Sequence, residues 1–168
     1  MRFLLVLALG LFVAACSTSE RSGTDASSTG STGTTTGQTM TGPEPGTQAH
    51  LNQTIGDRVF FDFDRYSIRS DMQGTVSAWA QWMKENPGVS ILVEGHADER
   101  GTRDYNYALG ARRSHEVKLA LTAMGVDGDR IETTTFGKDR PAVLGSNEAA
   151  WAKNRRAVVV VASQGPSA

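Results

Sequence analysis

Residues 17–49 limit how much of this 168-residue chain can fold, because they are rich in Ser, Thr and Gly and contain almost no apolar side chain. Such a segment cannot bury enough hydrophobic surface to offset the conformational entropy that folding costs. We therefore expect a flexible linker over residues 16–49 and one folded domain over residues 50–168. A domain of that length can enclose one hydrophobic core.

The N-terminus has the pattern of a targeting segment. Arg2 supplies positive charge, and residues 3–13 form an apolar run that is too short to span a membrane, which needs ~20 apolar residues. The tetrapeptide V-A-A-C ending at Cys16 resembles the lipobox of bacterial lipoproteins. That resemblance implies a signal peptide over residues 1–15, lipid on the Cys16 thiol and acylation of the new amino group. The alternative is an ordinary secretory signal followed by an incidental cysteine.

Lipid chains attached at Cys16 would anchor the protein by burying methylene groups, each contributing ~0.8 kcal/mol. The next residue is Ser17, whereas aspartate there would resemble an inner-membrane retention signal. We therefore expect the protein to be lipid-anchored at the periplasmic face of the outer membrane. Cys16 is the only cysteine, so the chain cannot form an internal disulfide.

Hydrophobic periodicity beyond residue 50 predicts strands and helices in alternation. The expected strands are 59–63, 89–94, 131–136 and 156–161, and the expected helices are one that ends before 86–88, one at 104–124 and a short turn at 147–152. The order β-α-β-α-β-(short α)-β indicates an α+β fold, a two-layer sandwich of helices on a sheet.

The second predicted helix has an arginine where an apolar residue is expected. Arg113 falls four residues after Leu109 and four before Val117, in the middle of the apolar stripe. A buried unpaired charge is very costly, so Arg113 must find a negatively charged partner. Asp98, in the turn before the helix, is the nearest strong candidate. A charged pair at the edge of a core is either a structural salt bridge or a ligand clamp.

Four ordered motifs stand out between residues 58 and 162. They are G-H-A-D-E-R-G-T followed by Y-N and L-G-x-R-R in residues 95–113, F-F-D-F-D-R-Y-S-I-R from Phe60, F-G-K-D-R-P-A-V-L-G from Phe136, and N-R-R-A-V from Asn154. Together they resemble the OmpA C-terminal-like family of peptidoglycan-binding domains. The resemblance implies that family's fold and non-covalent binding to peptidoglycan. Arg155 and Arg156 in the last motif either brace the sheet edge or contribute to the binding face.

In that family, the Asp of G-H-x-D and the Arg fifteen residues later bind the diaminopimelate residue of a peptidoglycan stem peptide. That spacing selects Asp98 and Arg113 here. A carboxylate can take the ligand's ammonium group, and a guanidinium can take its carboxylate in a planar fork. An internal Asp98–Arg113 salt bridge is compatible with this role, because it could open to accept a zwitterion.

Four further residues are candidates for the same site. The resemblance implies that the backbone amides at Phe63 and Asp64 bind a ligand carboxylate, while the Phe63 side chain is expected to pack in the core and Asp64 could instead cap the next turn. Thr102 and Asn106 either contact the ligand or cap and brace the loop.

Neither a metal site nor a catalytic residue is evident. His96 has Glu94, Asp98 and Glu99 nearby, but the H-E-x-x-H and H-x-x-E-H spacings of zinc sites are absent. No Ser or Cys nucleophile has an adjacent base. We therefore expect a non-enzyme without a cofactor or metal. The 17 basic residues are balanced by 18 acidic ones and form no block, so no nucleic-acid partner is expected.

The resemblance also implies a place in the Tol machinery of the envelope, with TolB and other Tol proteins as partners alongside peptidoglycan. Two other classes remain open: a lipoprotein that only serves as a protein-interaction scaffold, and a metal-dependent peptidoglycan hydrolase. A stator-associated member of the same family is a third alternative. The D-E-R-G-T, L-G-x-R-R and G-K-x-x-P motifs argue against that third alternative.

Overall fold

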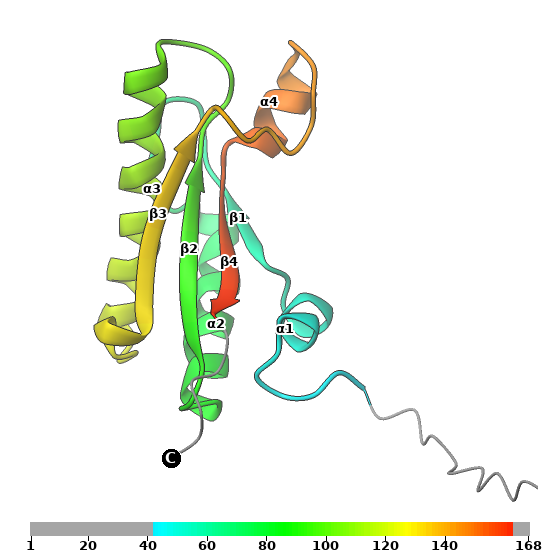
Figure 1. Cartoon of the computed structure of the whole chain (residues 1–168), viewed down its shortest axis with the longest axis vertical. Coiled ribbons are helices and arrows are strands. Elements are labelled where there is room, and N and C mark those ends of the chain that lie inside the picture. The colour runs from blue at the N-terminus through cyan, green and yellow to red at the C-terminus, as the bar shows by residue number, and fades with distance from the viewer. Residues whose placement is uncertain (1–41, 163–168) are drawn as a thin grey trace, which may run out of the picture. The chain divides into compact units, whose positions relative to one another are not determined.

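The computed structural model describes residues 42–162, and these contain a four-stranded sheet with helices on one of its faces (Figure 1). The elements in chain order are α1 (Gln48–Thr54), β1 (Arg58–Phe60), the 3₁₀ turn η1 (Ser70–Met72), α2 (Gln73–Glu85), β2 (Ser90–His96), α3 (Arg103–Ala123), the 3₁₀ turn η2 (Gly128–Arg130), β3 (Ile131–Gly137), α4 (Glu148–Asn154) and β4 (Arg156–Ala162). The predicted α+β sandwich is confirmed.

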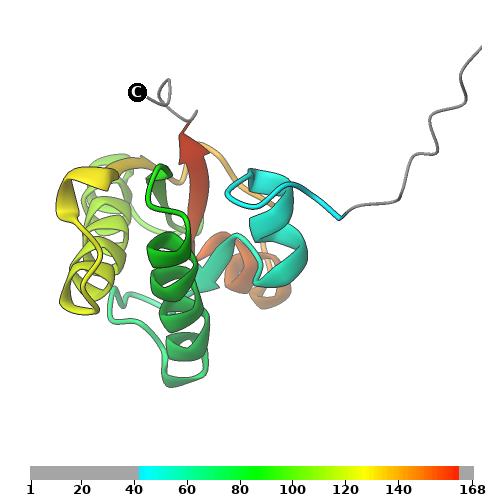
Figure 2. The same ribbon diagram turned by 90° about the horizontal axis from the view of Figure 1, so that it is seen from below.

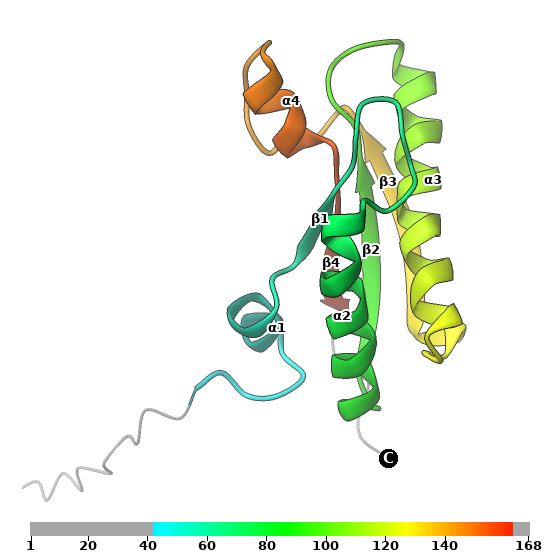
Figure 3. The same ribbon diagram turned by 180° about the vertical axis from the view of Figure 1, so that it is seen from behind.

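The sheet has the strand order β1-β4-β2-β3. β2 and β3 run parallel because α3 connects them, while β4 is antiparallel to both β1 and β2. Helices α2 and α3 lie side by side against one face of the sheet, as the views from below and behind show (Figures 2 and 3). The two layers are the sheet and this helix pair.

The core lies between the sheet and the α2–α3 pair. Trp79 and Met83 of α2 and Val117 and Leu121 of α3 are buried against the alternate strand residues that face the helices. Arg113 of α3 is as deeply buried as these apolar residues. The helical stripe predicted from the sequence is therefore the core-facing stripe, with the arginine inside it.

Helix α1 was not predicted, and it begins before the expected domain boundary at residue 50. Thr47 caps the helix by accepting the His50 N–H, and Leu51 is fully buried. The Gln48 side chain accepts the Val161 N–H at 2.7 Å and donates to the Val159 carbonyl at 3.3 Å. Gln48 thus pairs with the edge of β4 beyond the end of the short strand β1, where backbone groups would otherwise be unpaired.

Strand β1 is shorter than predicted. The expectation was 59–63, but pairing in β1 ends at Phe60 and the chain then turns. Asp64 adopts a positive φ of 55°, a backbone conformation that cannot continue a strand. The turn at residues 62–64 matters for function, because it carries the chain to one wall of a pocket.

Candidate functional site

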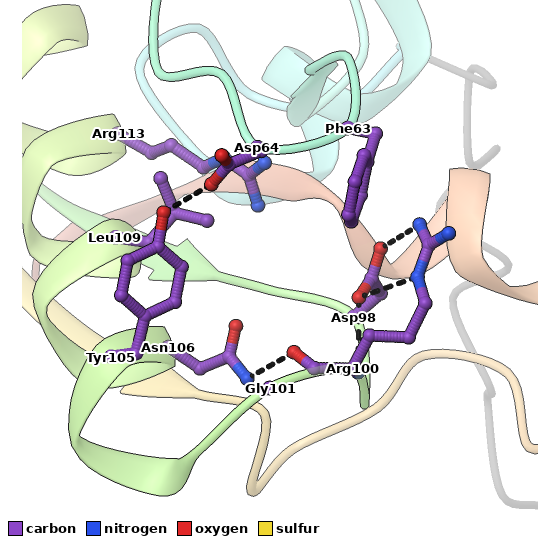
Figure 4. Close-up of a pocket in the computed structure, with 9 residues that line it drawn as sticks. All are labelled: Phe63, Asp64, Asp98, Arg100, Gly101, Tyr105, Asn106, Leu109 and Arg113. Atoms are coloured by element: carbon purple, nitrogen blue, oxygen red, sulfur yellow. Dashed lines mark hydrogen bonds and ion pairs between the residues drawn. The ribbon is translucent and has the colours of Figure 1, made fainter.

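A pocket of about 180 Å³ lies where the turn after β1, the loop after β2 and the start of α3 meet (Figure 4). Its lining residues are Phe63, Asp64, Asp98, Arg100, Gly101, Tyr105, Asn106, Leu109 and Arg113. Five of the six residues predicted for peptidoglycan binding are among them. Residues up to 50 positions apart in the sequence, from Phe63 to Arg113, are thereby brought to one site.

Close contact between α3 and β2 places Arg113 at this pocket. A Cβ atom added at Gly95 in β2 would lie 1.8 Å from the Gly110 carbonyl oxygen, and one at Gly110 would lie 2.3 Å from the Thr135 hydroxyl. Only glycine at both positions allows the helix backbone to rest on the strand. Arg113, one turn further along α3, is therefore held close to the end of β2.

Arg113 is held by backbone carbonyl groups and does not pair with a carboxylate. Its Nη1 donates to the His96 carbonyl at 2.7 Å, its Nε to the Arg65 carbonyl at 2.9 Å and its Nη2 to the Asp62 carbonyl at 3.1 Å. The guanidinium also lies 5.1 Å from the Phe61 ring centre. The side chain thus ties the turn after β1 to the end of β2.

The predicted pairing of Arg113 with Asp98 is wrong. Both oxygens of Asp98 are already taken by other arginines, and the carbonyls around Arg113 supply the partial negative charge that a buried cation needs. Within residues 42–162 no carboxylate forms a salt bridge with Arg113. The pocket is therefore lined by a cation whose charge no acidic side chain neutralises by direct contact.

Arg113 remains charged at neutral pH despite its burial. Desolvation lowers its pKa to about 10, and the neighbouring charges of Asp98 and Asp64 act in the opposite direction. A guanidinium has five N–H groups, and three of those on Arg113 are hydrogen-bonded to protein. Arg113 can therefore attract a ligand carboxylate.

Asp98 is the buried anion of the site, with only 4% of its surface exposed. Arg100 forms a fork on it, with Nε 3.2 Å from Oδ1 and Nη2 2.5 Å from Oδ2, and Arg155 Nη1 lies 3.4 Å from Oδ2. Burial raises the pKa of Asp98, but the hydrogen bonds and charge of Arg100 outweigh it, so the pKa lies below its ordinary value. Asp98 is thus a carboxylate at neutral pH.

Phe63 and Asp64 form the upper wall of the pocket in Figure 4. The expectation that Phe63 packs in the core is wrong, because its side chain is 57% exposed and the neighbouring Phe61 fills the core instead. Asp64 does not cap a turn with its side chain; it accepts a hydrogen bond from the Tyr105 hydroxyl. Among residues 42–162 the backbone N–H groups of Phe63 and Asp64 have no hydrogen-bond acceptor.

Asn106 and Thr102 take different positions. Asn106 is buried, lines the pocket and donates to the Arg100 carbonyl at 2.7 Å, so it braces the loop after β2. Thr102 caps α3 by accepting the Tyr105 N–H at 3.2 Å, and it is not among the lining residues. Asn106 thus braces the loop and Thr102 caps the helix, the alternatives to ligand contact that the sequence left open.

His96 is a buried residue at the end of β2, as expected for a structural histidine. Burial and the charges of Arg156 and Arg140 lower its pKa to about 4, although Glu94 Oε2 lies 3.6 Å from Nε2. Neither ring nitrogen has a hydrogen-bond partner among the described residues. In the same part of the chain, no three His, Cys, Asp or Glu side chains are grouped closely enough to hold a metal ion.

The site and the fold match one protein family. The sequence profile of the OmpA family matches residues 60–155, which include every residue that lines the pocket. The chain belongs to the OmpA family.

Several similar proteins carry the name peptidoglycan-associated lipoprotein. The one from Rhizobium meliloti is 46% identical over 121 residues, which cover 72% of this chain and 69% of that protein. The one from Haemophilus influenzae is 41% identical over 147 residues and 88% of each chain. This level of identity places the chain with the peptidoglycan-associated lipoproteins, as the sequence motifs predicted.

Solved structures show the same OmpA-like fold. The crystal structure of the peptidoglycan-associated lipoprotein from Burkholderia pseudomallei has a TM-score of 0.62 and 43% identity, covering 63% of this chain and 90% of that one. The C-terminal domain of Helicobacter pylori MotB has a TM-score of 0.59 at 22% identity, covering 64% and 84%. The second likeness concerns the fold alone.

Three parts of this OmpA-like site were not identified from the sequence: Arg100, Tyr105 and the position of Arg155 behind Asp98. Arg155 donates to the Phe61 carbonyl at 3.0 Å as well as contacting Asp98, so it both braces the sheet edge and supports the binding face. The D-E-R spacing was the available signal for Arg100, since a side chain two residues away can fold back onto a carboxylate.

The predicted signal peptide, the Cys16 lipidation site and most of the predicted linker lie outside residues 42–162. Among the residues that the structure does describe, no helix is both long and apolar enough to cross a membrane.

Proposed function

We propose that this protein is a non-enzymatic envelope lipoprotein that binds peptidoglycan through the diaminopimelate residue of its stem peptide. The observation that carries the proposal is the pairing of charges in one pocket. Asp98 supplies a buried carboxylate, and Arg113 supplies a charged guanidinium without an acidic partner among the described residues. A pocket that offers one anion and one cation fits a ligand that is itself a zwitterion.

Diaminopimelate in a stem peptide can present an ammonium and a carboxylate on one carbon. Asp98 would accept the ammonium in a charge-assisted hydrogen bond. Arg113 and the free N–H groups of Phe63 and Asp64 would bind the carboxylate. Leu109 and the Tyr105 ring supply apolar walls, which increase the strength of these polar contacts by excluding water.

A lipid anchor at Cys16 and a wall-binding domain at the other end of the linker would tether the outer membrane to the cell wall from its periplasmic face. The names of the similar proteins, which describe both a lipoprotein and peptidoglycan association, support this arrangement. As part of the Tol–Pal system, the tether would maintain envelope integrity and support constriction of the outer membrane during division. TolB would be a partner that competes with peptidoglycan for the same face.

Co-sedimentation with purified diaminopimelate-type peptidoglycan tests the binding proposal. The full chain in detergent is compared with Asp98→Asn, which keeps the shape but removes the charge, and with Arg103→Gln. Arg103 pairs with Asp139 outside the pocket and is a matched control. Asp98→Asn should weaken binding roughly 10–150-fold, since a hydrogen bond to a charged group contributes ~1.5–3 kcal/mol.

The control and wild type should sediment equally, and circular dichroism should show all three proteins folded. If folded Asp98→Asn sediments like wild type, the charge-pair site is wrong. If wild type stays in solution, a protein-interaction scaffold becomes the better function, and binding to TolB is then measured directly. Adding TolB to wild type bound to peptidoglycan should release it if the two compete.

The anchor has a separate test. Cys16→Ser should move the protein from the membrane fraction to the soluble fraction, because the thiol that carries the lipid is gone, while the circular dichroism spectrum of the domain stays the same. Retention of the variant in membranes would contradict lipid anchoring at this residue.

A further inference from the structure

Arg100 stands in the pocket at the place where a ligand ammonium would meet Asp98. Its guanidinium contacts both carboxylate oxygens of Asp98, and its backbone N–H donates to Oδ1 at 3.1 Å. Figure 4 shows this fork closing one side of the pocket. Asp98 is therefore already occupied by a cation in the protein without ligand.

The two arginines on Asp98 differ in how firmly they are held. Arg155 is 7% exposed and is fixed from behind by the Phe61 carbonyl and by Glu148. Arg100 is 30% exposed, and its guanidinium lies between two rings, 4.0 Å from the centre of Phe63 and 4.1 Å from that of Trp151. Arg100 is thus held at the solvent-facing mouth of the pocket, less firmly than Arg155.

We propose that Arg100 is a displaceable counter-ion that occupies the ammonium position of the free site, so that a ligand binds only by removing it from Asp98. This inference rests on the proposed function. Arg155 stays behind Asp98 in both states and keeps the carboxylate paired. The free energy of binding is therefore the ligand's own interaction energy minus the energy needed to break the Arg100–Asp98 fork.

A second anion is within reach of the displaced side chain. Arg100 Nη1 lies 3.9 Å from Glu148 Oε2, and Glu148 is 65% exposed. Moving from Asp98 toward Glu148 keeps Arg100 next to an acidic group while changing its position relative to the Trp151 ring. The displacement thus exchanges one ion pair for a more exposed one, without stranding a charge.

Displacement raises the interaction energy that any ligand must supply in order to bind at this site. A plain ammonium gains the contact with Asp98 but must break the fork of Arg100, so its net gain is small. A zwitterion breaks the same fork but also gains the interaction with Arg113. Arg100 therefore lowers the affinity for both kinds of ligand alike, and Arg113 supplies the discrimination: a diaminopimelate residue still binds, whereas a lysine residue falls below detection.

Arg100→Gln tests the proposal, because it removes the fork and leaves Arg155 on Asp98. Binding of two soluble stem peptides is measured by calorimetry on the full chain in detergent, one peptide with diaminopimelate and one with lysine at the same position. The variant should bind the first peptide roughly tenfold more tightly than wild type, equivalent to ~1.4 kcal/mol. The affinity for the lysine peptide should increase by the same factor, which brings it closer to the range that calorimetry detects.

Arg103→Gln is the matched control, since it removes the same charge three residues away from an exposed pair with Asp139. It should leave both affinities unchanged, which separates displacement from a general change in electrostatic potential. Circular dichroism and urea unfolding check that both variants remain folded.

Trp151 reports the movement itself. Its ring contacts the Arg100 guanidinium, whereas the other two tryptophans, Trp79 and Trp82, lie in the core and do not line the pocket. Ligand should change the fluorescence of wild type. The change should be absent in Trp151→Phe, which lacks the reporter, and in Arg100→Gln, which binds ligand but has no arginine to displace.

The outcomes separate the two proposals. Tighter binding by Arg100→Gln together with loss of its fluorescence change supports displacement. Equal or weaker binding by folded Arg100→Gln overturns displacement, because Arg100 would then be neutral or a ligand-binding group, while the proposed function stands if wild type binds and Asp98→Asn does not. If neither wild type nor Arg100→Gln binds the diaminopimelate peptide, both proposals fail.

Discussion

The inner wall of the pocket and its mouth each present an arginine, and the two are held in different ways. Arg113, on the inner wall, is fully buried and bonded to three backbone carbonyls. Arg100, at the mouth, is bonded to the side chain of Asp98 and lies between two aromatic rings. The first is fixed by the chain's own backbone and the second by groups that can move.

This difference assigns different tasks to the same kind of side chain. A cation locked by carbonyls keeps its position and charge whether or not a ligand is present, which suits a permanent receptor for a carboxylate. A cation held by an exposed fork can be exchanged for another cation. The site therefore combines a fixed half, around Arg113, and an exchangeable half, around Arg100. Substitutions in the two halves should lower the protein's free energy of unfolding by different amounts.

The largest expected effect is on the stability of Arg113→Ala. Removing the guanidinium leaves the carbonyls of Asp62, Arg65 and His96 without their donor and opens a cavity in the helix face, which should lower the free energy of unfolding by ~3–5 kcal/mol. Arg100→Ala should lower it less, by ~1–2 kcal/mol, because Arg100 is partly exposed and Arg155 still pairs with the buried Asp98. Urea unfolding at neutral pH measures both.

Similar losses in the two variants would contradict the distinction between a fixed and an exchangeable half. Arg113→Lys is an informative third variant, since lysine keeps the charge but has no planar fork to reach three carbonyls. It should recover a part of the lost stability, and any peptidoglycan binding it retains reports the contribution of charge alone.

The next effect concerns His96, whose carbonyl helps to fix Arg113. Its pKa is about 4 in the folded protein and near 6.5 when unfolded. Between these values the unfolded chain takes up a proton that the folded protein refuses, so stability should fall by about 3 kcal/mol as pH drops from 6.5 to 4. The cause is burial next to Arg156 and Arg140, with Glu94 too weak a counter-charge.

Urea unfolding at pH 7 and pH 4.5 checks this dependence. His96→Gln has no titrating ring and should lose most of the difference between the two pH values. His115→Gln, at an exposed position of α3, is the matched control and should retain it. An unchanged pH dependence in His96→Gln would show that the loss of stability in acid arises from other groups.

The fold and the fixed half of the site were predictable because they depend on periodicity. The stripe through Leu109 and Val117 places Arg113 in the core, and the apolar, β-branched runs in residues 89–94 and 156–161 locate β2 and β4. Helix α1 was not predictable in this way, since its single buried residue, Leu51, gives no repeat. The early end of β1 follows from the start of its partner β4 at Arg156, the residue paired with Phe60, which alternation within residues 59–63 cannot reveal.

The exchangeable half could not be predicted, because loop geometry decides it. The sequence suggested that Asp98 would pair with Arg113, and both residues do line one pocket. Which of Arg100, Arg113 and Arg155 reaches Asp98 depends on the path of the loop after β2 and on the turn after β1. Neither path leaves a periodic signal, so the motif spacing and the family resemblance selected two residues that line one pocket but suggested a direct contact that the structure does not contain.

The smallest effect distinguishes two roles of Thr102, the residue that caps α3 next to Gly101 of the pocket. Thr102→Ala removes the cap on the Tyr105 N–H and should lower the free energy of unfolding by ~1 kcal/mol. Thr102→Asn can still cap the helix but presents a different group to a ligand, so unfolding and peptidoglycan co-sedimentation together separate the roles. If Thr102 acts only as a cap, Asn restores stability and binding alike. A folded, stable Thr102→Asn that binds more weakly would instead show that the threonine contacts the ligand, and the mouth of the pocket would then extend to the first turn of α3.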